Sequence, residues 1–257
     1  MNINELSTQM TFTPVPIFGI KQDSSVVSGT GFVFSIRDGE YTMPFLITNY
    51  HVLKGTIEGY INFHKADIAK GVPTDEMVSV RFENQAVENN RLGKLDLVAI
   101  PLAATLDSFQ KKGLHFFLRS VEPKMIPTDE QWNELGAIED ITFIGYPNGL
   151  MDRGGRFPLV RRGITATPIW NDFNGEEQFL IDAGVFPGSS GSPVFVFNRG
   201  IYPDKDGMTV GNRLMFVGII SGTVTNNHIG YLNLGVVINS KAFYRELELF
   251  IKRITKK

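Results

Sequence analysis

Short apolar runs recur along almost the whole chain of 257 residues, and glycine, proline and asparagine separate them. The runs are rich in Val, Ile, Phe and Thr, which is typical of strands in barrels and sandwiches. We take nine strands as a minimum, and the 26 glycines suit the tight turns and bulges of small closed barrels. The pattern therefore predicts an all-β protein. The nine expected strands lie at 31–36, 44–48, 77–82, 97–101, 141–146, 178–181, 193–197, 214–221 and 232–238.

The strand pattern is interrupted between residues 106 and 137, where charge, proline and isolated aromatic residues replace the apolar runs. We interpret 106–137 as a connection between two β units, one at 1–105 and one at 138–238. The final stretch, 239–257, has apolar residues at helical spacing, with Lys and Arg near its end. Such an apolar face usually packs on the chain's own core, and docking to another partner is the alternative. The apolar positions of the expected helix are Phe243, Leu247, Phe250, Ile251 and Ile254.

Composition fits a globular protein and excludes few classes of function. With 42% hydrophobic residues the chain can bury a sizeable core. A net charge of -2 and a pI near 6.1 give no reason to expect nucleic acid or an anionic membrane as partner. The chain has no cysteine, so disulfides cannot hold the fold, which fits a reducing compartment.

No targeting, membrane or metal signal stands out either. The first residues lack the basic and apolar regions of a signal peptide, and no run approaches the roughly 20 apolar residues of a membrane helix. Four scattered histidines without cysteine do not form a zinc cluster. We therefore expect a soluble cytoplasmic protein with no metal and no cofactor, whose oligomeric state the sequence leaves open.

Three segments beside the expected strands carry chemistry. His51 follows one strand, Asp96 precedes another, and the segment 188–192, Gly-Ser-Ser-Gly-Ser, lies between two more. A histidine, an aspartate and a serine in this chain order point to a general base, a carboxylate that orients it, and a nucleophile. The leading hypothesis is a serine endopeptidase.

Each segment also has a simpler interpretation. A lone histidine is usually a surface or satisfied core residue, Asp96 could be exposed after a turn, and 188–192 could be a flexible linker. Against this, an unpaired carboxylate beside an apolar run is costly to bury, and a histidine N–H is a suitable partner. The strands on both sides anchor the Gly-Ser segment, where the N–H groups of Gly188 and Ser190 can point at a developing oxyanion. The other histidines are expected at the surface, and they are His64, His115 and His228.

These motifs resemble those of the chymotrypsin-like (trypsin-fold) serine proteases, in particular the bacterial branches. Residues 48–52, Thr-Asn-Tyr-His-Val, resemble the Thr-Asn-x-His-Val of the high-temperature-requirement proteases. Asp-Ala at 182–183 with Pro-Gly-Ser-Ser-Gly at 187–191 resembles their Asp-Ala…Pro-Gly-Asn-Ser-Gly segment. Residues 188–194 also resemble the Gly-x-Ser-Gly-Ser-Pro-Val of staphylococcal-type glutamyl endopeptidases. The resemblance, which extends from about residue 29 to 238, implies two six-stranded antiparallel barrels.

The resemblance also implies a role for each candidate residue. Of the three serines at 188–192, only Ser190 has the glycine two before and the glycine one after that the family pattern demands, so it would be the nucleophile. His51 would act as general base and then acid, and Asp96 would orient it. Gly188 and Ser190 would form the oxyanion hole.

The same resemblance implies where a peptide substrate binds. Residues 221–223 match the strand that pairs with the substrate backbone. Gly184 stands where an acid would favour cleavage after Arg or Lys, and Val185 stands where glutamyl endopeptidases have a threonine. We therefore expect an apolar pocket for a small or medium aliphatic or aromatic side chain. The expected substrate-binding residues are Gly184, Val185, Ser221, Gly222, Thr223 and Gly235.

Two other classes of function stay open. A protease-like fold without catalysis would serve as a peptide-binding or scaffold module, with a misaligned triad. An α/β-hydrolase esterase needs the order Ser…Asp…His and helices that alternate with strands. Only His228 follows Ser190, and the strand-dense pattern disfavours that fold.

Overall fold

The structure is a computed structural model that describes residues 2–152, 154, 156–204, 207–226 and 230–255. The chain divides into two compact units. The first consists of Met1–Glu122, Ile144–Leu159 and Pro187–Ser192, and the second of Pro123–Phe143, Val160–Phe186 and Pro193–Lys257. The segment with the predicted nucleophile therefore belongs to the same unit as the predicted base and its carboxylate partner.

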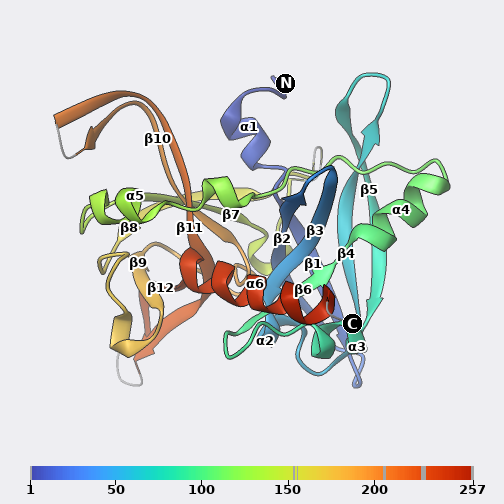
Figure 1. Cartoon of the computed structure of the whole chain (residues 1–257). Coiled ribbons are helices and arrows are strands. Elements are labelled where there is room, and N and C mark those ends of the chain that lie inside the picture. Colours follow the sequence, from blue (N-terminus) through green and yellow to red (C-terminus); the bar gives the residue numbers. More distant parts are fainter. Residues whose placement is uncertain (1, 153, 155, 205–206, 227–229, 256–257) are drawn as a thin grey trace. The chain divides into compact units, whose positions relative to one another are not determined.

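An antiparallel six-stranded sheet forms the first unit, in the order β5-β4-β1-β2-β3-β6 (Figure 1). Its strands are β1 (Pro14–Lys21), β2 (Val26–Asp38), β3 (Tyr41–Asn49), β4 (Thr56–Asp67), β5 (Val72–Glu83) and β6 (Leu97–Pro101). Side chains alternate between the two faces of a strand, so one face of each strand can supply the core. The core of this unit includes Ile17, Val33, Leu46, Ile61, Phe63, Val80 and Val98.

Short helices connect or precede the strands of the first unit. They are α1 (Leu6–Met10), α2 (Tyr50–Leu53), α3 (Asn84–Asn89), α4 (Ala103–Lys111) and the 3-10 turn η2 (Pro147–Gly149). The helix α2 starts where β3 ends, and its residues Val52 and Leu53 are buried. This packing fixes the position of the residue before them, His51.

A closed barrel forms the second unit, in the order β10-β11-β12-β9-β8-β7 (Figure 1). Its strands are β7 (Asp140–Gly145), β8 (Leu159–Thr165), β9 (Gln178–Asp182), β10 (Pro193–Asp204), β11 (Gly207–Asn226) and β12 (Gly230–Asn239). The 3-10 turns η1 (Pro123–Met125) and η3 (Phe173–Gly175) and the helix α5 (Asp129–Glu134) complete this unit. Its core includes Ile141, Phe143, Phe179, Ile181, Val194, Val217 and Val237.

A buried ion pair lies beside this core. The guanidinium of Arg213 is 2.6 Å from the carboxylate of Glu139, and their side chains are only 10% and 11% exposed. Arg213 also donates through Nε to Asn198 at 2.8 Å, and its guanidinium lies 4.8 Å from the ring centroid of Tyr202. A second oxygen of Glu139 accepts from the backbone N–H of Gly136 at 2.8 Å. The pair therefore has the additional hydrogen bonds that buried charges require.

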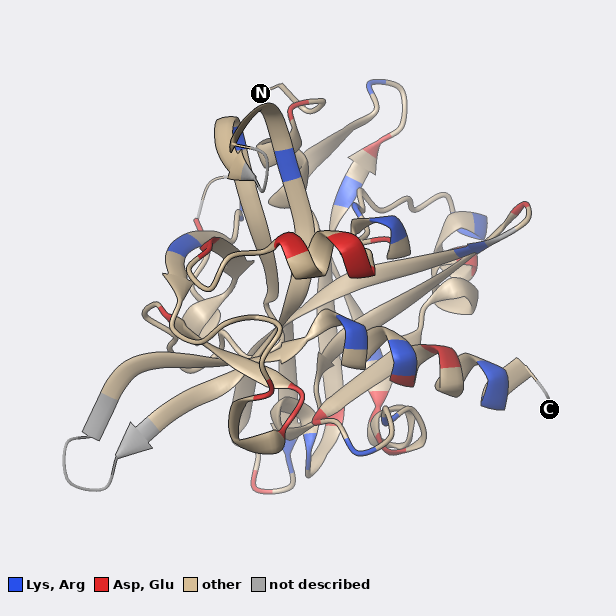
Figure 2. Cartoon of the chain, turned by 60° about the vertical axis from the view of Figure 1, so that its left-hand side comes forward, with Lys and Arg blue, Asp and Glu red and all other residues tan. Residues whose placement is uncertain are grey.

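The C-terminal helix α6 (Ser240–Thr255) packs on β11 and β12. Asn239 caps it, because its side-chain oxygen accepts the N–H of Ala242 at 2.7 Å. Of the predicted apolar positions, Phe243, Leu247 and Phe250 are buried. Lys and Arg lie in its last turns, as Figure 2 shows toward the C-terminus. The apolar face of α6 thus covers the chain's own barrel.

These observations confirm the predicted all-β fold, in which two six-stranded antiparallel units are followed by a C-terminal helix; the second unit is a closed barrel and the first is a sheet. The described residues form twelve strands, so the minimum of nine missed 14–21, 56–67 and 159–165. The stretch 106–137 contains the helix α5 and part of α4, which the sequence did not predict. The domain boundaries stay a prediction, and residues 1, 256 and 257 lie outside the described residues.

The expectation that His64 lies at the surface was wrong. Its side chain is buried, and its ring packs edge-on against Phe12 with 5.4 Å between centroids. His115 is half-buried, and His228 lies outside the described residues. In the part of the chain that the structure describes, no helix is long and apolar enough to cross a membrane.

Candidate active site

His51 and Asp96 meet at the end of β3 and the start of β6. The carboxylate of Asp96 accepts the backbone N–H of His51 at 2.9 Å through Oδ1, and its Oδ2 is 2.5 Å from Nδ1 of the same histidine. The backbone carbonyl of Asp96 accepts the N–H of Tyr50 at 3.1 Å and the side-chain amide of Asn49 at 2.9 Å. Four contacts with residues 49–51 therefore hold Asp96 in place.

This contact decides which nitrogen of His51 carries the proton. An ionised carboxylate can only accept, so Nδ1 of His51 must be the donor to Asp96. In a neutral imidazole Nε2 is then an acceptor. The side chains are 46% exposed for His51 and 34% for Asp96, so the pair is open to solvent on one side.

Ser190 lies on the other side of the imidazole. Its Oγ is 3.1 Å from Nε2 of His51, a distance at which the hydroxyl can donate to the ring. The structure thus brings together His51, Asp96 and Ser190, 139 residues apart at their widest, in hydrogen-bonding order. All three belong to the first compact unit.

Two glycines shape the loop that carries Ser190. Gly188 has a φ of 85° and Gly191 a φ of 89°, in the left-handed region that side chains rarely adopt. A Cβ at position 191 would overlap the carbonyl oxygen of Thr30, and one at position 188 would overlap the backbone of Asn148. The loop therefore needs glycine at both positions for its conformation and for its close packing.

Two hydrogen bonds fix the direction of the N–H groups in this loop. The carbonyl of Pro187 accepts from Asn148 N at 2.6 Å, and the carbonyl of Ser189 accepts from Ser192 N at 3.0 Å. In a planar trans peptide the N–H points opposite to the C=O. The N–H groups of Gly188 and Ser190 therefore point away from these two donors.

The predicted substrate-binding residues all lie in the second unit. Gly235 and Val185 are buried in contact with each other, so both belong to its core. Residues 221–223 lie at half-buried positions of β11, where Gly222 and Thr223 pair with β12 and Ser221 lies at a register shift. Gly184 is half-buried beside the guanidinium of Arg161, which also lies 4.8 Å from the ring centroid of Phe186.

Sequence reasoning missed two neighbours of the predicted residues, Arg161 and Thr30. Arg161 is a cation beside Gly184, where the sequence predicted an apolar surface. Thr30 is fully buried and donates its hydroxyl to the carbonyl of Gly188 at 2.8 Å. The one signal for Thr30 in the sequence is a hydroxyl residue between two glycines, directly before the expected strand 31–36.

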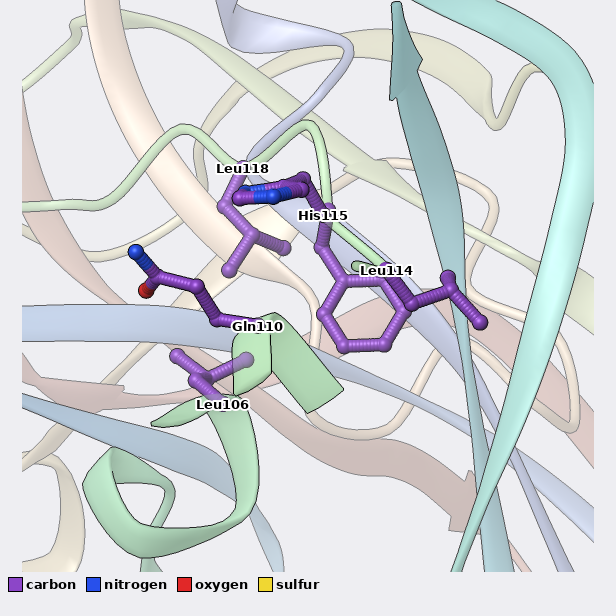
Figure 3. Close-up of a pocket in the computed structure, with 6 residues that line it drawn as sticks. Leu106, Gln110, Leu114, His115 and Leu118 are labelled. Carbon is purple, nitrogen blue, oxygen red and sulfur yellow. The ribbon is translucent and has the colours of Figure 1, made fainter. Parts of the chain in front are cut away.

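A cavity beside α4 has no part in this arrangement. It has a volume of about 190 Å³, and none of the predicted site residues lines it. Its walls are formed by Leu106, Gln110, Leu114, His115, Phe116 and Leu118 (Figure 3). Within the described ranges, no group of three or more His, Asp or Glu residues could hold a metal ion.

Comparison with known proteins indicates the family and the fold of the chain. A family profile described as a trypsin-like peptidase domain matches residues 29–200, more than half of the chain. No curated protein sequence matches the chain. Among solved structures, HL collagenase is similar at a TM-score of 0.52 and 10% identity, over 96% of this chain and 94% of the collagenase. That likeness shows a shared fold.

Two bacterial proteases are similar over comparable lengths. The active form of the Rv3671c protease from M. tuberculosis has 16% identity and a TM-score of 0.47, over 95% of this chain and 83% of that protein. The protease Anisep from Arthrobacter nicotinovorans has 12% identity and a TM-score of 0.48, over 89% and 90%.

Proposed function

Because the chain belongs to the trypsin-like peptidase family and is a serine peptidase, we propose that it hydrolyses peptide bonds through an acyl-enzyme formed on Ser190. The observation that carries the proposal is the 3.1 Å distance between Nε2 of His51 and Oγ of Ser190, with Nδ1 bound to Asp96 on the other side. The substrate is a protein or peptide.

The proposed reaction uses the proton positions derived above. Nε2 of His51 accepts the hydroxyl proton as Oγ of Ser190 bonds to the carbonyl carbon of the peptide. The imidazolium then carries the accepted proton on Nε2 beside the original one on Nδ1, and the carboxylate of Asp96 stabilises its charge. Nε2–H donates this proton to the leaving amine, and the C–N bond breaks. A water molecule, deprotonated by Nε2 of His51, then bonds to the acyl carbon; the ester bond to Oγ breaks, and Nε2–H returns the proton to Oγ of Ser190.

The N–H groups of Gly188 and Ser190 are our candidates for the oxyanion hole. Their support is the orientation of the two peptide groups: the carbonyls of Pro187 and Ser189 accept from Asn148 and Ser192, so the N–H groups of Gly188 and Ser190 point the opposite way. Donors held in this way stabilise the negative charge that develops on the substrate oxygen.

The preference for an apolar side chain, expected from the sequence, stays a prediction. The position of Arg161 supports a competing preference for an acidic side chain. A guanidinium beside Gly184 favours a substrate carboxylate if position 184 faces the substrate. A peptide panel that differs only in the residue before the cleaved bond separates the two preferences. Faster cleavage after Leu or Phe supports the apolar pocket, and faster cleavage after Glu or Asp, lost in Arg161→Gln, supports the cationic one.

A fluorophosphonate probe tests the proposed nucleophile, because it reacts with an activated serine. We expect wild-type protein to be labelled and Ser190→Ala to remain unlabelled. Ser192→Ala is the matched control, since this serine lies in the same loop with its hydroxyl buried and without a partner among the described residues. Absence of labelling in folded wild-type protein would favour a catalytically silent peptide-binding module, and labelling that moves to another serine would refute the role of Ser190.

A further inference from the structure

Thr30, on β2, is bound to the Ser190 loop through both its side chain and its backbone. Its hydroxyl donates to the carbonyl of Gly188 at 2.8 Å and accepts the N–H of Tyr146 at 2.9 Å. Its backbone N–H donates to the carbonyl of Ser190 at 3.0 Å. The residue is fully buried, so water is not available to replace these bonds.

Thr30 is also tied to the strand that leads to His51. Its carbonyl accepts the hydroxyl of Thr48 at 2.7 Å, and Thr48 is fully buried on β3. Gly191 packs against the same carbonyl so closely that a Cβ there would overlap both threonines. One residue thus contacts the nucleophile loop on one side and the strand of the base on the other.

The hydroxyl of Thr30 has a specific consequence for Gly188. Glycine has few conformational restrictions, so its flanking peptide groups need partners to hold one orientation. Asn148 holds the carbonyl before Gly188, and Thr30 holds the carbonyl of Gly188 itself. Asn148 acts through its backbone, whereas Thr30 acts through a side chain that a substitution can remove.

We infer that Thr30 is a positioning residue for the nucleophile loop: its hydroxyl holds the peptide group that follows Gly188 and so keeps this flexible glycine, whose N–H is the proposed oxyanion donor, in one conformation. The inference rests on the proposed function. It differs from a purely structural role because the loss should affect the reaction of bound substrate more than binding. Removing a whole oxyanion donor costs about a hundredfold or more in rate.

The test compares Thr30→Val, which keeps the shape but removes the hydroxyl, with Thr30→Ser, which restores it. The substrate is a p-nitrophenyl ester. The amplitude of the initial burst of p-nitrophenol gives the concentration of sites able to form the acyl-enzyme. For Thr30→Val we expect kcat per competent site to fall about tenfold to a hundredfold, because a misoriented donor loses part of its effect. We expect KM to change less than about threefold, and Thr30→Ser to recover most of kcat.

Thr56→Val is the control, because the Thr56 hydroxyl is also buried and donates to a backbone carbonyl, that of Leu53, at 2.8 Å. It should keep wild-type kcat. An unchanged kcat in Thr30→Val, no recovery in Thr30→Ser, or an equal loss in Thr56→Val each overturns the inference. If Thr30→Val does not fold, Thr30→Ala replaces it under the same criteria. Wild-type protein without a burst overturns the proposed function itself, and the inference with it.

Discussion

Replacing Asp96 with Asn tests whether the carboxylate sets the proton position on His51. The backbone N–H of His51 points at Oδ1 of Asp96, so the oxygen of an Asn side chain is held at that position. The amide nitrogen then takes the place of Oδ2 and donates to Nδ1 of His51. Nδ1 becomes an acceptor, and the ring proton moves to Nε2, where it faces Oγ of Ser190.

The expected effect is large, because Nε2 can then no longer accept the hydroxyl proton. The wrong tautomer typically lowers kcat about 10⁴-fold, or about 5.4 kcal/mol of transition-state stabilisation. KM should change little, since Asp96 does not face the substrate in the proposed mechanism. The assay is steady-state hydrolysis of an ester or peptide, together with the rate of fluorophosphonate labelling.

The control is Asp107→Asn on α4, an exposed carboxylate that pairs with Lys111 one helical turn later. It removes the same charge and should leave kcat unchanged. If Asp96→Asn keeps kcat within tenfold of wild type while folded, the argument from the tautomer is wrong.

Three further predictions concern the fold. Burial holds the pKa of His64 below its usual range, so below about pH 6.5 the unfolded chain binds a proton that the folded chain does not, and the free energy of unfolding falls. In urea unfolding, the difference in this free energy between pH 7.5 and pH 5.5 should be smaller in His64→Phe than in wild type. Arg213→Met leaves the carboxylate of Glu139 buried without its cation and should lower the free energy of urea unfolding by about 3–5 kcal/mol, whereas a small loss would mean that water reaches Glu139. Gly191→Ala forces a left-handed residue against the Thr30 carbonyl and should cost at least about 1–2 kcal/mol in the same assay, so wild-type stability would contradict the packing described.

Local pattern was sufficient to predict most strands but not all of them. The strand β1 contains Pro14 and Pro16, residues that normally argue against a strand interior, yet it pairs with both β2 and β4. The strand β8 carries two arginines beside its apolar residues. Pairing with neighbouring strands decides both cases, and a single-sequence pattern does not contain that information.

The burial of His64 was not predicted for a similar reason. Neighbouring residues on a strand normally face opposite sides, but Phe63 and His64 are both buried. Besides Phe12, the ring of His64 faces Phe157, with 6.3 Å between centroids. These residues are distant in sequence, so nothing local distinguishes this histidine from an exposed one.

The candidate triad was accessible from sequence because each residue lies in a short, recognisable segment beside a strand. Thr30 and Arg161 were not. The hydroxyl of Thr30 meets Gly188 across 158 positions of sequence, and Arg161 on β8 meets Gly184, which lies after the end of β9. Supporting residues of this kind act through contacts that only the folded chain creates.

The segment Pro187–Ser192 is flanked in sequence by stretches of the second unit, yet it packs as part of the first. One folded body therefore supplies base, carboxylate and hydroxyl, while Gly184 and residues 221–223 belong to the other. If these residues bind the peptide as predicted, substitutions in them alter substrate preference without touching the unit that carries His51, Asp96 and Ser190. Substrate preference and the proposed chemistry can then evolve separately, because their residues belong to different units.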